Sequence, residues 1–406
     1  MKKLEKSVPV IRFKGFSEAW EQRKLGDLVV DYVEKTSVQN QFPMLTSSQQ
    51  KGIVLQEDYF ANRQVTTENN IGYFVLPRGY FTFRNRSDND VFVFNRNDII
   101  DRGIISYFYP VFTLKSADSD FFLRRINNGI QRQLSIQAEG TGQHVLSLKK
   151  FKNIVAMFPS EGEQKKIGSF FKQLDDTIAL HQRKLDTLKL IKKGFLQQMF
   201  PNSEEKVPRL RFADFDREWE QCKLGEISDK VIEKNKESTY FETLTNSAEY
   251  GIISQREFFN KDISNEKNLN GYYIVRENDF VYNPRISNYA PVGPIKRNKL
   301  GRIGIVSPLY YVFRTFNTNQ SFLEYYFDGT VWHNFMLLNG DSGARADRFA
   351  IKDSVLKEMP IPYSTLHEQE KISSFLDEIT IIINLHQNKL KKLSSLKKTY
   401  LQNMFI

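Results

Sequence analysis

Two short segments rich in Arg, Asn and Ser have side chains that could contact nucleic acid. Arg can donate two hydrogen bonds to guanine, Asn can pair in the same way with adenine, and Ser can hold phosphate groups. Each segment follows a run of apolar and aromatic residues that is typical of a strand. The candidate DNA-contacting residues are Arg84, Asn85, Arg86 and Ser87 in the first segment and Asn283, Arg285, Ser287 and Asn288 in the second.

A second pair of candidate segments consists of polar, Gly-containing loops at 140–144 and 340–348. They occupy corresponding places in the two halves of the chain, but their side chains differ. Ordinary surface turns have a similar composition. DNA contact is favoured because the two loops occupy matching positions in the two halves and carry different side chains. We expect it from Thr141, Gln143 and His144 in the first loop and from Ser342, Arg345 and Arg348 in the second.

The sequence shows no arrangement of residues that is typical of catalysis or metal binding. The five His residues are scattered and lack metal-ligand spacing, and there is no Gly-rich loop of the nucleotide-binding type. Asn283-Pro284-Arg285 only partly matches the Asn-Pro-Pro-aromatic motif of amino-methyltransferases, because the second Pro and the aromatic residue are missing. No nucleophile is accompanied by a base and an orienting group. We therefore expect no catalytic site, no metal site and no bound cofactor in this chain.

The candidate segments come in pairs because the chain is internally duplicated. The motif Trp-Glu-Gln-x-Lys-Leu-Gly begins at Trp20 and again at Trp219, and Glu-Gln-x-Lys-Ile begins at Glu163 and again at Glu368. Between these matched blocks the two halves differ strongly. This pattern indicates one scaffold that is used twice to present two different surfaces.

Each half has the pattern of a mixed α+β region followed by one long helix. Short runs of β-branched and aromatic residues, punctuated by Gly, Asn, Asp and Pro, predict strands joined by turns. The predicted fold is α+β, with two similar globular domains separated by two long helices that form an antiparallel coiled coil. The domains span 1–160 and 207–366, the helices span 161–200 and 367–406, and a linker spans 201–206.

In both long helices the apolar residues are spaced alternately by four and three positions, which is the pattern of a coiled-coil seam. Lys192 and Lys397 interrupt this seam at matching places, and so does one His in each helix. Antiparallel pairing would bring the two His close together, where we expect packing against the seam rather than metal binding or pH sensing. The predicted seam residues are Ile167, Phe171, Leu174, Ile178, His181, Leu185 and Leu188 in the first helix and Ile372, Leu376, Ile379, Ile383, His386, Leu390 and Leu393 in the second.

Composition sets broad limits on the class of protein. The net charge of +10 over 406 residues is typical of proteins with a polyanionic partner, although Lys-rich helices are often only solvated faces. No apolar run is long enough to cross a bilayer. The single Cys222 excludes an internal disulfide, so we expect a cytoplasmic protein without a membrane partner.

The duplicated arrangement resembles the specificity subunit of type I restriction-modification enzymes. The resemblance depends on the motifs that begin at Trp20, Trp219, Glu163 and Glu368, together with the Gln-x-Met-Phe ends of both long helices, and it spans nearly the whole chain. It implies two target-recognition domains that each read one half of a split, asymmetric double-stranded DNA sequence. The two long helices would set the gap between these domains.

The resemblance also implies partners that perform the chemistry. Two methyltransferase subunits would dock on the long helices and bring S-adenosylmethionine, and restriction subunits would bring ATP and Mg. Two alternatives remain open on the sequence. One is a non-enzymatic scaffold whose duplicated domains bind protein, and the other is a self-contained methyltransferase or nuclease, which the missing motifs disfavour.

Overall fold

The computed structural model describes residues 8–60, 69–202, 204–259, 266–341 and 347–406. The chain divides into two compact units. Unit 1 comprises Met1–Gln182 and Asn388–Ile406, and unit 2 comprises Arg183–Gln387. Both long helices are divided between the units, so each unit contains the first part of one long helix and the last part of the other.

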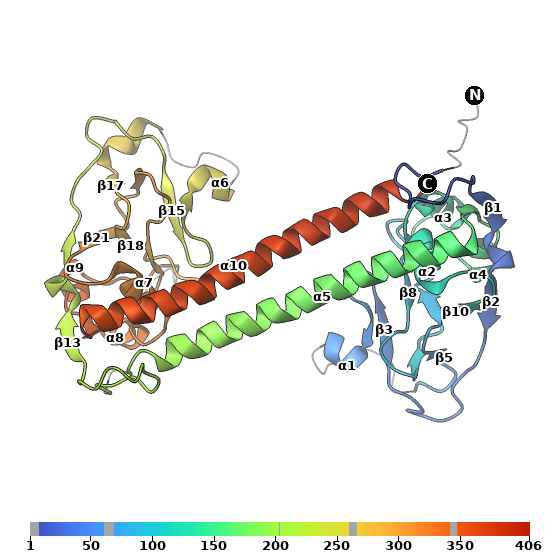
Figure 1. Cartoon of the computed structure of the whole chain (residues 1–406), viewed down its shortest axis with the longest axis horizontal. Helices are drawn as coiled ribbons and strands as arrows, with labels where there is room; N and C mark the ends of the chain where they lie inside the picture. Colours follow the sequence, from blue (N-terminus) through green and yellow to red (C-terminus); the bar gives the residue numbers. More distant parts are fainter. Residues whose placement is uncertain (1–7, 61–68, 203, 260–265, 342–346) are drawn as a thin grey trace. The chain divides into compact units, whose positions relative to one another are not determined.

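Unit 1 is built on a four-stranded antiparallel sheet with the order β2-β10-β6-β8. Its strands are β2 (Val29–Tyr32), β10 (Val111–Leu114), β6 (Phe81–Phe83) and β8 (Phe94–Arg96). Figure 1 labels β2, β8 and β10 in this unit. Four strand pairs surround the sheet: β1 (Glu21–Lys24) with β12 (Val155–Phe158), β3 (Leu45–Ser48) with β4 (Gly52–Leu55), β5 (Phe74–Pro77) with β9 (Arg102–Ile105), and β7 (Arg86–Ser87) with β11 (His144–Val145). The helices and the 3-10 turn are η1 (Leu25–Asp27), α1 (Gln56–Tyr59), α2 (Ser119–Asn127), α3 (Gln131–Gln137) and α4 (Leu148–Lys152).

Aromatic side chains from the sheet and from α2 form the core of unit 1. Phe81 and Phe112 are cross-strand partners, and their rings stack with centroids 5.4 Å apart. Helix α2 begins after Asp118, whose carboxylate accepts a hydrogen bond of 2.8 Å from the backbone N–H of Phe121. This cap fixes the start of the helix and directs Phe121 and Phe122 into the core.

Unit 2 repeats this architecture with the sheet order β14-β21-β18-β19. Its sheet strands are β14 (Ser228–Lys230), β21 (Tyr311–Thr315), β18 (Phe280–Tyr282) and β19 (Ile295–Arg297). The strand pairs are β13 (Glu220–Lys223) with β22 (Pro360–Tyr363), β15 (Leu244–Ser247) with β16 (Gly251–Ser254), and β17 (Tyr273–Val275) with β20 (Gly304–Val306). The helices and 3-10 turns are η2 (Leu224–Glu226), α6 (Gln255–Phe259), η3 (Glu266–Gly271), α7 (Gln320–Asp328), α8 (His333–Asn339) and α9 (Asp353–Leu356).

The two long helices, α5 (Glu161–Gln198) and α10 (Leu366–Asn403), pair in an antiparallel direction within each unit. In unit 1 the ring centroids of Phe170 and Tyr400 are 5.1 Å apart, and the Lys397 ammonium lies 2.6 Å from a carboxylate oxygen of Asp175. Residue numbers therefore rise along α5 as they fall along α10. The predicted α+β fold with two similar units and antiparallel long helices is confirmed.

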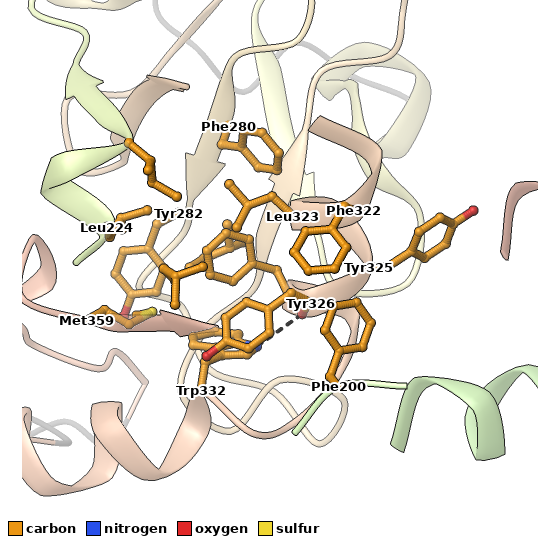
Figure 2. Packing of buried hydrophobic residues seen from close by; sticks show 14 of the residues in the cluster. Phe200, Leu224, Phe280, Tyr282, Phe322, Leu323, Tyr325, Tyr326, Trp332 and Met359 are labelled. Atoms are coloured by element: carbon orange, nitrogen blue, oxygen red, sulfur yellow. Dashed lines mark hydrogen bonds between the residues drawn. The ribbon is translucent and has the colours of Figure 1, made fainter. Parts of the chain in front are cut away.

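Each unit takes the last residues of a long helix that begins in the other unit. Met404 and Phe405, at the end of α10, are buried in the core of unit 1. Met199 and Phe200, at the end of α5, are buried in the core of unit 2. Figure 2 shows Phe200 beside Phe322 and Tyr326, with ring centroids 5.1 and 5.9 Å away. The side chains of the duplicated Met-Phe ends therefore complete the hydrophobic core of each unit.

The two Lys residues in the seam have different partners in the two units. Lys397 pairs with Asp175, which also binds Arg124 in α2. Lys192 instead lies 4.8 Å from the ring centroid of Tyr325 in α7, and burial lowers the pKa of its ammonium group. Each seam Lys therefore has a partner side chain in its own unit. A slipped helix register would separate these partners, so it is unfavourable.

The predicted seam residues lie on the covered side of their helices. Ile167, Phe171, Leu174, Leu185, Ile372, Leu376, Ile379 and Ile383 are buried, whereas Ile178, His181, Leu188, His386, Leu390 and Leu393 are half-buried. The proximity of the two seam His residues stays a prediction. Within the part of the chain that the structure describes, none of the helices combines the length and apolar character that crossing a bilayer requires.

Candidate DNA interface

In unit 1 the two predicted DNA-contacting segments are joined by backbone hydrogen bonds. Strand β7 pairs with β11, so that Ser87 lies opposite His144 and Arg86 lies opposite Val145. The pairing continues with a bond of 2.9 Å from the N–H of Leu146 to the carbonyl of Asn85. Segments far apart in the sequence thus form one continuous surface.

Unit 2 joins its own two segments in the same way. Arg285 and Arg348 face each other in an antiparallel β-bridge. The N–H of Ile286 donates to the carbonyl of Asp347 at 3.1 Å, and the N–H of Phe349 donates to the carbonyl of Pro284 at 2.7 Å. Of the other predicted residues in this loop, Ser342 and Arg345 lie outside the described residues.

Three predicted residues of unit 1 project into solvent. Arg84, Arg86 and Thr141 are exposed. The guanidinium carbon of Arg86 lies 4.3 Å from the ring centroid of Phe108, which orients the side chain before any ligand binds. A pre-oriented guanidinium loses less conformational freedom when it pairs with a base edge or a phosphate.

Other predicted residues of unit 1 make hydrogen bonds within the surface. The Ser87 hydroxyl is buried and accepts a bond of 3.0 Å from the N–H of Val91. Asn85 is half-buried, and its N–H donates to the carbonyl of Phe108 at 3.0 Å. Gln143 donates to Asp88 at 2.9 Å, and His144 contacts the Asp90 carboxylate. These residues shape the surface, and their own contacts with DNA stay predictions.

In unit 2 the predicted residues divide in the same manner. Arg285, Ser287, Asn288 and Arg348 are exposed. Asn283 is buried, and its amide donates 2.9 Å to the carbonyl of Asn246 while it accepts 3.0 Å from the N–H of Arg285. The structure gives Asn283 the role of holding the turn, and a contact between its amide and adenine stays a prediction.

Exposed aromatic residues border both surfaces, and sequence reasoning missed them. In unit 1 they include Tyr107, which lies in the turn between β9 and β10. In unit 2 they include Tyr250 and Tyr289, which lie in turns after β15 and β18. The available signal was an aromatic residue next to Ser, Asn or Glu in a turn, because such a residue has no strand face to pack against. Among the described residues, no group of three or more His, Cys, Asp or Glu is placed to hold a metal.

Comparison with known proteins agrees with the duplicated architecture. The family model of the type I restriction modification DNA specificity domain matches residues 17–190 and again residues 216–395. The specificity subunit of the type I restriction enzyme MjaVIII of Methanocaldococcus jannaschii is 25% identical over 284 residues, which cover 65% of this chain. This match spans 64% of that relative, which is less than two thirds of its length.

One solved structure shares the fold along nearly the whole chain. The crystal structure of the S subunit of a type I restriction-modification system from M. genitalium has a TM-score of 0.59 at 10% identity, and the match covers 98% of this chain and 99% of that one. The HsdS subunit of Thermoanaerobacter tengcongensis has a TM-score of 0.45 at 17% identity, with 95% and 96% covered. Because the family model matches both halves and together most of the chain, this chain belongs to the type I restriction modification DNA specificity domain family, with two such domains.

Proposed function

We propose that this chain is the sequence-reading subunit of a type I restriction-modification complex and that each unit reads one half of a two-part DNA site. The observation that supports this most is that both units join two polar segments into one exposed surface. Unit 1 presents Arg84 and Arg86 there, and unit 2 presents Arg285 and Arg348. Because the remaining side chains of the two surfaces differ, the half-sites should differ and the full site should be asymmetric.

The chemistry in this proposal belongs to partner subunits. Two methyltransferase subunits would modify adenine with S-adenosylmethionine, and restriction subunits would cut unmodified DNA with ATP and Mg. This chain would contribute recognition and no catalysis, in the cytoplasm where its DNA lies. The family assignment supports this division, since the matching model describes a DNA specificity domain.

The outward faces of the long helices offer a docking surface for the methyltransferase subunits. On α10, Ile381 and Leu385 are one turn apart and are 57% and 62% exposed. On α5, Leu190 is also exposed. A helix that is packed on one side only normally carries polar residues on its solvent-exposed face. Exposed apolar residues at this spacing therefore support a protein partner at these positions.

Exchanging residues 27–155 for those of a relative is expected to change one half of the methylated DNA motif only. The exchanged region contains the whole joined surface of unit 1 and none of unit 2. The measurement is genome-wide sequencing of methylated adenines after co-expression with the methyltransferase subunits. A motif that changes in both halves, or in neither, would contradict one reader per unit.

Replacing Arg86 by Ala is expected to weaken DNA binding by the assembled complex about ten-fold and to relax its preference at one base pair, which is the expected effect of losing one bidentate contact. The matched control is Arg78→Ala, which removes an exposed Arg that is bound to Asp101 outside both segments. Binding is measured by titration of motif and single-substituted duplexes at fixed salt. Equal losses for the two variants would show that only overall charge matters.

The alternative of a protein-binding scaffold makes the opposite prediction. In that case co-expression with methyltransferase subunits would produce no two-part methylation motif, and neither Arg86→Ala nor the exchange of 27–155 would alter any DNA sequence preference.

A further inference from the structure

A pocket of about 580 Å³ lies beside the joined surface of unit 2. It is lined by the β15–β16 hairpin, by α6, by the turn that follows β18 and by Arg348. Its size is that of a site for a small organic group. The reading of base edges by exposed Arg side chains, as proposed above, does not require such a pocket.

Aromatic rings stand at the mouth of this pocket. Tyr289 is 79% exposed and lies in the turn from Ser287 to Ala290, which is closed by two reciprocal backbone hydrogen bonds of 3.0 Å. Tyr250, on the β15–β16 turn, is also exposed and packs edge-on against Phe258 with ring centroids 6.0 Å apart. Rigidly placed, exposed aromatic rings are the surfaces on which unstacked bases pack.

The pocket also contains hydrogen-bond acceptors without a protein donor. Asn246 is only 2% exposed, and its amide nitrogen donates to the carbonyls of Val281 and Pro294 at 2.6 and 3.0 Å. These two bonds fix the orientation of the amide. Within the described part of the chain, its oxygen accepts no hydrogen bond, and neither does the side-chain oxygen of Gln255. Both residues line the pocket, and both oxygens are covered by protein atoms, so a ligand N–H group reaches them only after the neighbouring side chains shift.

Positive charge stands next to the rings. Arg285 and Arg348 both line the pocket and face each other across their β-bridge. Both side chains are exposed, so they can reach the phosphates on either side of a nucleotide. Aromatic stacking, buried acceptors and guanidinium groups are together the chemistry that holds a nucleotide with its base displaced from the helix.

Unit 1 does not repeat this arrangement. In the register of the strands, Ser47 takes the place of Asn246, and its hydroxyl already accepts a bond of 2.8 Å from Asn95. The turn that corresponds to the one carrying Tyr289 contains Asp88 and Asp90, whose carboxylates bind Gln143 and His144. The pocket of unit 2 is also lined by the carboxylate of Glu249, but the turn from Asn283 to Ala290 contains no Asp or Glu, so the two turns present different charge to phosphate.

We infer that the pocket of unit 2 receives one unstacked base from the DNA that this unit binds. The base stacks on Tyr289, its N–H groups donate to Asn246 and Gln255, and Arg285 and Arg348 hold the flanking phosphates. This inference rests on the proposed DNA-reading function. It makes Tyr289 a determinant of DNA distortion in one half-site only.

The test uses the complex assembled with its methyltransferase subunits and duplexes that contain the methylated motif. A mismatch is introduced at one base pair at a time through the half-site of unit 2 and its flanks. At the position whose base enters the pocket, a mismatch should tighten binding several-fold, because the base no longer has to be unpaired. At positions that are read within the duplex, a mismatch should weaken binding about ten-fold.

Variants link that position to the pocket. Tyr289→Ala should abolish the tightening and weaken binding of the matched duplex about ten-fold, which is the effect of losing one stacked base. Tyr289→Phe should preserve both properties because it keeps the ring. The matched control is Phe241→Ala, since Phe241 is a 73% exposed aromatic residue of unit 2 that is not among the residues lining the pocket.

The outcomes are separable. If no mismatch tightens binding, or if the tightening survives Tyr289→Ala, the inference is overturned while the DNA-reading function stands. If the assembled complex recognises no motif, the proposed function fails first and the inference falls with it.

Discussion

Glu163→Gln is expected to lower the free energy of unfolding of unit 1 by about 3 kcal/mol, as is usual when one partner of a buried ion pair is removed. Glu163, near the start of α5, is fully buried, and both its oxygens accept hydrogen bonds of 2.7 Å from Arg12. The neutral amide removes the only carboxylate that Arg12 hydrogen-bonds among the described residues. Hydrogen–deuterium exchange of the whole chain in denaturant measures the loss and assigns it to a unit.

A matched pair of controls tests whether the charge is the cause. Replacing both Arg12 and Glu163 by Met should cost much less than Glu163→Gln, because no charge is then left unpaired. Glu368→Gln should reproduce the effect in unit 2, where Arg211 binds both oxygens of Glu368 at 2.7 and 2.9 Å. A double Met variant as unstable as the single variant would show that packing, and not charge, dominates.

The pair should remain intact throughout the neutral range of pH. Donating hydrogen bonds to the Glu163 carboxylate raises the pKa of Arg12 in the folded protein. A group whose pKa is raised on folding contributes stability below its unfolded pKa and loses that contribution only as the pH rises through its folded pKa. For Arg this window lies at strongly alkaline pH, so the Arg12 side of the pair introduces no pH dependence near neutrality.

Phe405→Ala is expected to destabilise unit 1 by about 3–5 kcal/mol, the usual effect of removing a buried aromatic ring, while unit 2 keeps its stability. Phe405 lies near the last residue of the chain, yet its ring contacts the rings of Trp20, Phe121 and Phe171 with centroids 6.4, 5.7 and 5.8 Å away. The variant therefore removes a buried ring from a core that is made mostly of residues from the first half of the sequence.

Phe200→Ala should have the reverse effect, because Phe200 contacts Trp219, Phe322 and Tyr326 in unit 2. Hydrogen–deuterium exchange again resolves the two units. The control is Leu396→Ala on the exposed side of α10, which should change stability by less than about 0.5 kcal/mol. The exchange of helix ends would be contradicted if Phe405→Ala lowered protection in unit 2, or if Phe200→Ala lowered protection in unit 1.

The proposed function gives this exchange a consequence. Because each unit is completed by a helix that begins in the other, the two readers cannot fold as separate consecutive halves of the chain. Damage at the last residues of the chain should therefore impair reading of the half-site that belongs to unit 1. Through the matched Met-Phe motifs, the folding of each unit would then depend on both long helices.

The sequence by itself determined the features that depend on local patterns. The 4–3 spacing of apolar residues identified α5 and α10, because a helix repeats its faces over a few residues whatever surrounds it. Alternating aromatic runs identified the strands around Phe81 and Phe280 in the same way. The duplicated motifs at Trp20 and Trp219 indicated two similar units, since equal local signals in equal order specify equal folds.

Only the tertiary structure decided which surfaces meet. Periodicity shows that one side of α10 is buried, but it does not show that Phe405 enters the core formed around Trp20. The side-chain types predicted a base contact for Asn283, yet the fold engages its amide nitrogen with the carbonyl of Asn246 in β15 and its amide oxygen with the N–H of Arg285. Likewise, Tyr289 is a candidate for stacking with a base only because the fold places it and Asn246 around one pocket. The physical reason is that long-range contacts depend on the path of the whole chain, and no local pattern contains that path.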